Sequence, residues 1–316
     1  MLELLKEKIA TQRELLQELL LTSMKNTSER MSMIMNNRDA LEMLLLDELA
    51  NMLYCKHLYV LDANTVQLTA NITRGGRDMS QLDRDRSDRV YMQGIAGVTD
   101  FKLSDAYISK NKKRPSLTAV HVIKNAAGEL TGYLGADYDI RELPHTELLY
   151  KQTSVWQQMR GDPSIRQGLF SQQRVESMID RNIDDVMALM QELMQEHGVF
   201  HGKLHFSSNR ATIWLEADPY NYRLLSMDEL INPDICLAYP RQSYTDKAVV
   251  PADKIPEIFE QLKLLRFTDE NIYLRSGSLN VCNGLLGLNF SCDGSHYIYY
   301  TEFLDKESKF WVEQRD

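Results

Sequence analysis

The chain has few of the residues that mark fibrous, disordered or disulfide-bonded proteins. Its 316 residues include only 15 glycines, 8 prolines and 4 cysteines. So little glycine and proline excludes a collagen-like or low-complexity chain. The cysteines are scattered and never form a C-x-x-C pair, which favours reduced thiols over a disulfide framework.

Long hydrophobic runs are also missing. The best candidate, Leu15–Met24, contains Gln17 and Glu18 and is far shorter than the roughly 20 apolar residues that cross a bilayer. The first residues alternate leucine with charged side chains, which is not the shape of a signal peptide. We therefore expect a cytoplasmic protein with no membrane partner.

Positive charge is sparse. The chain has 36 Lys and Arg against 45 Asp and Glu, a formal charge of −9. Nucleic-acid binding needs clustered basic side chains on phosphates, so we expect no nucleic-acid partner. The densest basic stretch, Lys110–Arg114, is interpreted as a solvated loop.

Common catalytic motifs are absent: the sequence has no G-x-S-x-G, no Walker loop and no G-x-G-x-x-G. His197, His201 and His205 follow at steps of four, but Gly198 should end any helix there. On a strand, two of them would lie about 13 Å apart, too far for one ion. Neighbours in sequence such as Cys292 and His296 rarely make a nucleophile–base pair. We predict no catalytic residue, no metal and no cofactor.

Helical and strand patterns divide the chain into two domains, as its length suggests. Residues 1–53 show apolar residues at three- and four-residue steps, with Asn26–Glu29 as a capping box that would split the helix. Such an exposed helix needs a covering partner, so we expect a homodimer. A second helix is predicted over 172–196, and Asp162-Pro163 has the pattern of another helix start.

Residues 54–145 change to strand periodicity. Strands are predicted at 58–61 and 66–70, followed by a polar loop over 74–89 and a short helix near 87–95. Residues 116–123 and 130–139 are predicted to form an antiparallel hairpin.

Residues 199–316 have the pattern of a second α+β domain. Strands are predicted at 203–206 and 211–215, and Asp253 is expected to cap a helix that ends near Arg266. Four short strands should follow, with turns at Gly277, Gly284 and Asp293-Gly294. Clustered Ser, Asn, Arg and His residues could form a second pocket here, or could be strand ends and turns.

Four motifs occur in order between residues 89 and 139. Arg89 is followed by Tyr91, then come S-x-x-Y ending at Tyr107, P-x-x-T ending at Thr118, and G-x-x-G-x-D ending at Asp137. This order resembles the Cache family of ligand-sensing domains, which are extended PAS-like (PDC-type) domains, over about residues 40–145. Members of that family are usually extracytoplasmic and tethered by membrane helices, and this chain departs from that pattern.

The resemblance implies an α+β fold: a long N-terminal helix (1–53), a PAS-like antiparallel-sheet sensor domain (54–145), a helical connector (146–198) and a second α+β domain (199–316). It also implies a ligand pocket. Arginine offers a fork of donors for a carboxylate, tyrosines give walls with polar tips, and aspartate accepts from an ammonium group. The candidate ligand-binding residues are Arg89, Tyr91, Tyr107, Thr118, Asp137 and Asp139. Alternatively, Arg89 and Asp137 form an ion pair that only closes the domain.

The function predicted from these features is a cytoplasmic sensor of a small metabolite, an amino acid or organic acid, that relays binding through dimeric helices. A protein partner such as a kinase or cyclase would receive the signal. Two alternatives stay open: an enzyme whose site lies in the C-terminal domain under regulation by the sensor, or an interaction adaptor that binds no ligand.

Overall fold

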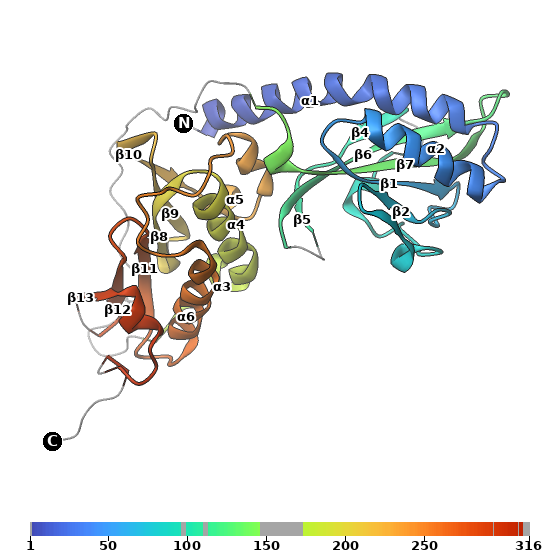
Figure 1. The fold of residues 1–316 in the computed structure, drawn as a ribbon. Coiled ribbons are helices and arrows are strands. Elements are labelled where there is room, and N and C mark those ends of the chain that lie inside the picture. Colours follow the sequence, from blue (N-terminus) through green and yellow to red (C-terminus); the bar gives the residue numbers. More distant parts are fainter. Residues whose placement is uncertain are drawn as a thin grey trace. The chain divides into compact units, whose positions relative to one another are not determined.

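The protein is described by a computed structural model that covers residues 2–95, 99–109, 113–145, 173–292, 294–308 and 310–311. It forms two units, each with its own sheet and helices (Figure 1). Residues 2–145 with Cys236–Pro240 make the first unit, and the second contains residues 173–235 and 241–311. The α+β class expected from the sequence is confirmed. No helix in the described part is long and apolar enough to cross a membrane.

The first unit is built on an antiparallel sheet of order β3-β2-β1-β7-β6-β4, with β5 also paired to β6. Its strands are β1 (Cys55–Asp62), β2 (Asn71–Thr73), β3 (Gly76–Asp78), β4 (Phe101–Leu103), β5 (Tyr107–Ile108), β6 (Pro115–Lys124) and β7 (Leu130–Asp139). The predicted hairpin is confirmed as β6 and β7. Gly128, in the turn, has a φ of +83°, which glycine adopts without strain.

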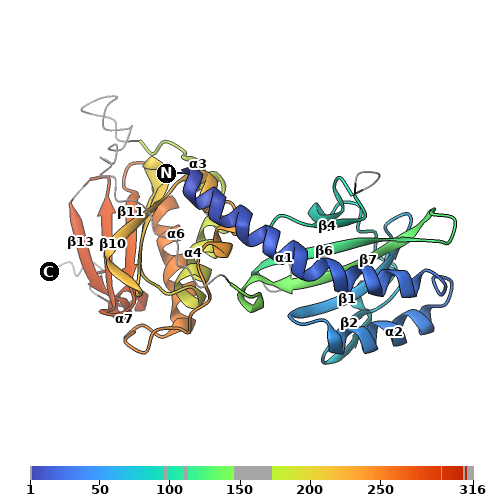
Figure 2. The ribbon, with the colours of Figure 1, turned by 90° about the horizontal axis from the view of Figure 1, so that it is seen from above.

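Two helices cover one face of this sheet. Figure 2 shows α1 (Leu2–Met31) and α2 (Arg38–Asn51) across the strands. The predicted capping box at 26–29 is wrong. Thr27 and Ser28 lie inside α1, where their hydroxyls donate to the carbonyls of Ser23 and Lys25. The chain turns at 32–36 instead, and Asn37 caps α2 by accepting from the Ala40 N–H.

The segment that follows β1 departs from its predicted strand. Residues 66–70 make only isolated bridges, because side chains occupy the backbone groups that a ladder would use. Thr69 accepts from the Val60 N–H, and Gln67 donates to the Thr69 carbonyl. The strand forms later, as β2. The polar stretch 74–89 contains β3 as well as loop, and the predicted short helix is one turn, η2 (Val90–Met92).

The second unit is built on a fully antiparallel sheet of order β10-β9-β8-β11-β12-β13. Its strands are β8 (Val199–His205), β9 (Arg210–Leu215), β10 (Asp218–Leu225), β11 (Leu274–Asn280), β12 (Leu285–Phe290) and β13 (Ser295–Tyr299). Its helices are α3 (Met178–Arg181), α4 (Ile183–Glu196), α5 (Met227–Leu230), α6 (Ile255–Phe267) and α7 (Tyr300–Leu304). Helices α4 and α6 pack against β8 and β11 on one face (Figure 1).

Two predicted helix starts in this unit are wrong. The single helix expected over 172–196 is two helices, α3 and α4, which meet at Asn182. The first begins at Met178, where Ser177 and Asp180 form a capping box, and the second ends before Gly198, whose φ is +72°. Helix α6 is preceded by the 3-10 turn Ala252–Lys254, so Asp253 lies in that turn and is not the cap. The expected helix start at 162–163 lies outside the described residues.

Two strands were misread from the sequence. Gly277 lies inside β11 and is not a turn. A Cβ at this position would come within 2.9 Å of a Leu262 methyl of α6. The glycine therefore allows the helix to pack closely on the strand. Asp218–Leu225, which has the polar composition of a loop, is the edge strand β10, where exposed polar residues are common.

A buried ion pair joins the helices of this unit. Arg266 of α6 donates through Nε and a terminal nitrogen to the two carboxylate oxygens of Asp180, at 2.8 and 2.7 Å. Both side chains are fully buried. Arg266 also donates to the Leu274 carbonyl of β11, which ties α3, α6 and the sheet together.

Candidate functional site

The candidate site lies on the face of the first sheet opposite α1 and α2. Antiparallel pairing places residues of β1, β7 and β6 directly beside one another, so they form rows across the strands. One row is polar and contains His57, Asp137 and Thr118. The next contains Tyr59, Gly135 and Val120, and the third Leu61, Tyr133 and Val122. The face thus changes from polar to apolar along the strands.

A chain of hydroxyl groups ends on the Asp137 carboxylate. Thr118 donates to Asp137 Oδ1 at 2.7 Å. The Thr118 oxygen is then left to accept from the Tyr107 hydroxyl, also at 2.7 Å. Tyr107 comes from β5, so this chain ties the short strand to the centre of the sheet.

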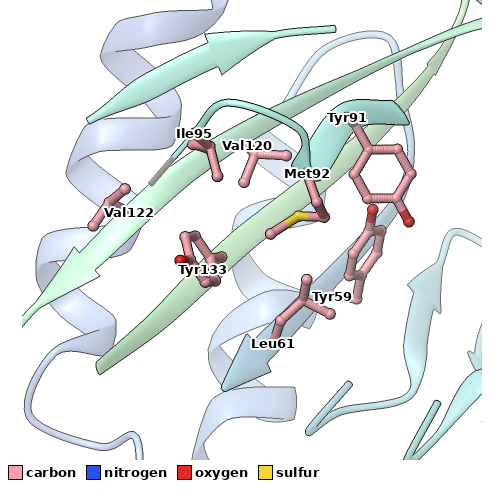
Figure 3. Close-up of a cluster of buried hydrophobic side chains, with 8 residues drawn as sticks. All are labelled: Tyr59, Leu61, Tyr91, Met92, Ile95, Val120, Val122 and Tyr133. Atoms are coloured by element: carbon pink, nitrogen blue, oxygen red, sulfur yellow. The ribbon is translucent and has the colours of Figure 1, made fainter. Parts of the chain in front are cut away.

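A second hydroxyl chain reaches the same carboxylate oxygen. Tyr59 donates to Asp137 Oδ1 at 3.3 Å, and its oxygen shares a hydrogen bond with Tyr91 of η2. The rings of Tyr91 and Tyr107 lie 6.2 Å apart and tilted. In Figure 3 the hydroxyl end of Tyr59 points toward Tyr91.

Apolar side chains close this face of the sheet (Figure 3). The cluster consists of Tyr59, Leu61, Tyr91, Met92, Ile95, Val120, Val122 and Tyr133, with Tyr107 packed against it. Gly135 has room for the Tyr59 ring above it, since a Cβ at that position would overlap the ring. The segment around η2 therefore lies on the sheet as a lid of side chains.

The tyrosines stay neutral. Burial, together with the nearby Asp137 carboxylate, raises the pKa of Tyr59, Tyr91 and Tyr107 above the ordinary range. Tyr59 donates directly to Asp137, and Tyr107 reaches the same carboxylate through Thr118.

Three cationic or titratable groups lie beside the tyrosines. Arg86 is buried, donates to the Gln67 side-chain oxygen and lies 5.6 Å from the centre of the Tyr59 ring. His57 Nδ1 is 3.6 Å from Asp137 Oδ2. The Arg89 side chain is 18% exposed and acts electrostatically on Tyr91 and Tyr107.

Arg89 does not pair with Asp137. Its ion partner is Asp88, at a distance of 3.8 Å, and the Asp88 side chain is 71% exposed. The ion pair that we kept as an alternative from the sequence is therefore not formed. Arg89 and Asp137 nevertheless both act electrostatically on Tyr91 and Tyr107.

Asp139 has a different role from Asp137. It caps the 3-10 turn η3 (Ile140–Glu142) by accepting from the Arg141 N–H, and it forms an ion pair with the Arg141 guanidinium. Strand alternation placed both aspartates on one face, but β7 ends at Asp139 and the chain turns there. Asp139 thus serves the turn and not the tyrosine cluster.

The structure brings together five of the six predicted residues: Arg89, Tyr91, Tyr107, Thr118 and Asp137. Sequence reasoning missed Tyr59, Arg86 and His57, which lie among them. Strand alternation could have found Tyr59 and His57, because both face the same side of β1. Nothing local marks Arg86, which is one of many charged residues in a polar stretch.

The residues that we examined for other chemistry lie in the second unit. His201 and His205 are on β8, and the described residues contain no group of three metal-ligating side chains. Cys292 is exposed after β12, and the His296 ring packs edge-on against Phe290 at 6.0 Å.

No protein family and no curated protein matches the sequence. Among solved structures, the ligand-binding domain of the Campylobacter jejuni chemoreceptor Tlp3 in complex with L-valine is 17% identical with a TM-score of 0.35, covering 44% of this chain and 58% of that chain. That of the Pseudomonas fluorescens chemoreceptor CtaA with L-alanine is 18% identical with a TM-score of 0.33, covering 43% and 57%. An extracellular ligand-binding receptor from Desulfohalobium retbaense is 14% identical with a TM-score of 0.35, covering 43% and 24%.

Two of these structures are ligand-binding domains of chemoreceptors, and the third is an extracellular ligand-binding receptor. The matched region spans less than three fifths of each of them and less than half of this chain.

Proposed function

We propose that the first unit is a sensor domain for a small molecule that carries a carboxylate and an amine, such as an amino acid. One observation carries the proposal: Arg89 and Asp137 flank the same cluster of tyrosines without bonding to each other. A guanidinium fork suits a carboxylate, and an aspartate that already accepts two hydroxyl protons still has lone pairs for an ammonium group. The solved domains bound to L-valine and L-alanine are in line with this ligand class.

Binding would couple to movement of η2. Tyr91 and Met92 are nearly fully buried on the sheet, so a ligand between Arg89 and Asp137 must displace part of their packing. The energy for that displacement has to come from the difference in ligand affinity between the closed and the open arrangement. Ligand binding is then a shift between two positions of one segment.

The signal would pass through helices in a homodimer to a protein partner such as a kinase or cyclase. Exposed leucines on α1, Leu15 and Leu19, lie one turn apart, and Met43 and Leu46 are exposed on α2. We place the protein in the cytoplasm, where free thiols such as its four cysteines are usual. Light scattering at micromolar concentration tests the dimer, and a monomer would contradict it.

A thermal-shift screen of amino acids, organic acids and amines tests the sensor. A ligand at 100 times its dissociation constant adds about 2.7 kcal/mol to the free energy of unfolding. We expect the shift to disappear in Arg89→Ala and in Asp137→Asn. Arg84→Ala is the matched control, because Arg84 is exposed on the same loop and its side chain bonds only to Gln81 among the described residues. No shift with any compound on the folded wild-type protein would reject the sensor.

The closed tyrosine cluster favours a second candidate, an interaction adaptor that binds no ligand. Its polar groups are bonded to one another and its apolar groups are packed, so the face is complete without a ligand. The two candidates differ in the screen above: an adaptor shows no shift with any compound, yet requires the exposed leucines of α1 for assembly.

A further inference from the structure

Lys203 stands at the centre of a three-by-three grid of side chains on the second sheet. The register pairs it with Thr212 of β9 and with Ser278 of β11. Paired residues of adjacent antiparallel strands point to the same face. The other members are paired in the same way: His201 with Trp214 and Asn280, and His205 with Arg210 and Ser276.

This grid faces away from α4 and α6. Gly202 of β8, which alternates with the grid residues, receives the side chains of Met190 and Met194 from α4. Gly277 of β11 likewise packs on Leu262 of α6. The grid residues therefore occupy the opposite face, where Lys203, His201 and His205 are each half-buried.

The grid contains no carboxylate, although the protein carries a net charge of −9. The Lys203 side chain forms no ion pair and no hydrogen bond with any described residue, while other lysines of this unit, such as Lys247 and Lys263, each have a carboxylate within 2.8 Å. Burial lowers the pKa of Lys203, which shows that its charge is partly desolvated. A half-buried cation without an anion is costly unless something supplies the anion.

The neighbours of Lys203 suit an anion as hydrogen-bonding groups. The His201 ring stacks on Trp214 at 4.5 Å and His205 Nε2 lies 3.2 Å from the Thr212 hydroxyl, which fixes both rings. Burial, with Lys203 as the second cause, lowers the pKa of both histidines to about 4, so they are neutral at pH 7 and each keeps one N–H donor. Ser276 adds a hydroxyl donor in the adjacent strand, and the Ser278 hydroxyl, which donates to the Gly287 carbonyl at 3.4 Å, becomes a second donor when it rotates.

We propose that this face of the second sheet binds a small molecule through an oxyanion group, a carboxylate or a phosphate, held at Lys203. The lysine supplies the charge, and the hydroxyls of Thr212, Ser276 and Ser278 supply neutral donors around it. The site is separate from the tyrosine cluster of the first unit and does not depend on it.

The test uses the full chain with two probes, inorganic phosphate and succinate. The indole N–H signal of Trp214 in a proton–nitrogen NMR spectrum reports on the grid, and its loss in Trp214→Phe identifies it. We expect at least one probe to shift this signal saturably, and Lys203→Met to weaken that binding by at least about tenfold. Lys247→Met is the matched control and should bind as the wild type does, because Lys247 is exposed and paired with Glu216.

Lys203→Arg is a second variant for the case in which Lys203→Met is unstable. It keeps the positive charge and should retain binding. Phosphate alone or succinate alone identifies the oxyanion, and both together show that the site accepts either. The proposal is overturned if neither probe shifts the signal at about 10 mM, a concentration that would reveal millimolar affinity. It is equally overturned if Lys203→Met binds as tightly as the wild type.

Discussion

The two sheets of this protein have helices on one face and differ in what happens on the other. In the first unit, the rows of β1, β7 and β6 have Gly135 at their centre, and the Tyr59 ring with the η2 segment closes over them. In the second unit, the rows of β9, β8 and β11 have Lys203 at their centre, and the lysine has no ion partner among the described residues. Gly135 leaves room for other side chains of the chain to cover the first sheet. In our proposal, Lys203 instead binds the oxyanion group of a small molecule.

Polar groups follow the same division. On the first sheet, the hydroxyls of Tyr59, Tyr107 and Thr118 all lead to one carboxylate, so the polar row is satisfied internally. On the second sheet, donors surround a cation and no acceptor with a charge is present in the grid. Burial of polar groups is tolerated when they are bonded to one another, which is the arrangement in the first unit.

The largest effect that we expect concerns the second unit, which we predict to depend on its buried ion pair more than on its sheet face. Asp180→Asn leaves Arg266 buried without its anion and should lower the free energy of unfolding by about 3–5 kcal/mol, measured by urea denaturation. Asp184→Asn, at the exposed pair with Lys263, is the control and should cost less than about 1 kcal/mol. Equal costs would show that the buried pair is not decisive.

The same pair sets an acid limit for this unit. Burial raises the pKa of Asp180, but hydrogen bonds from Arg266 and Ser177 outweigh it, so the pKa is lowered overall. The carboxylate therefore contributes stability above its unfolded pKa, and that stability is lost as pH falls through the lower folded pKa.

An effect of intermediate size on stability distinguishes the covered face of the first sheet from the grid face of the second sheet. Gly135→Ala forces a methyl group into the Tyr59 ring, and overpacking of this kind costs about 1–3 kcal/mol. Gly287 lies on β12 beside the grid, and a Cβ at this position would come within 2.7 Å of the Ser278 hydroxyl oxygen. That hydroxyl ends a short side chain that can rotate, and the neighbouring Tyr297 is exposed. We expect a cost below about 1 kcal/mol for Gly287→Ala. Chemical denaturation of both variants measures this difference, and a larger cost at Gly287 would reverse the assignment of the two faces.

The smallest effect at neutral pH is expected from two histidines of the grid, which change the free energy of unfolding only in acid. His201 and His205 have folded pKa values of about 4, below the ordinary value of about 6.5. Because the unfolded state binds the proton more readily, stability falls as pH drops from about 6.5 toward about 4. NMR titration of the imidazole carbon-bound protons should give these two midpoints near pH 4. Replacing both histidines by Gln should flatten the decrease, and midpoints near 6.5 would contradict the burial of the grid.

Residues 116–139 illustrate where prediction from sequence succeeds. The hairpin β6–β7 follows from two segments with apolar alternation and a turn with Asn125 and Gly128, all of which act over a short range. Prediction failed at 66–70 and at Gly277, and no strand was predicted over Asp218–Leu225, because distant parts of the chain decide the structure there. Thr69 bonds a neighbouring strand, Gly277 receives a helix, and β10 is an edge that tolerates polar residues.

For the candidate site, the order of motifs in the sequence selected Tyr91, Tyr107, Thr118 and Asp137, because each occupies a fixed place on a local strand or turn. Strand alternation added Asp139, which it cannot distinguish from Asp137, whereas the family resemblance favoured Asp137. Only the end of β7 and the contact with Arg141 separate the two aspartates.

By itself, the sequence determined the α+β class, the helix-rich start and the central hairpin, because these depend on local periodicity and turn chemistry. Its resemblance to a family supplied Tyr91 and Tyr107 of the tyrosine cluster. The tertiary structure alone decided which groups meet across strands. Register placed Tyr59 over Gly135 and put Lys203 beside the hydroxyl of Thr212. Pairing between strands that are far apart in the chain is set by the packing of whole layers, which no local pattern encodes.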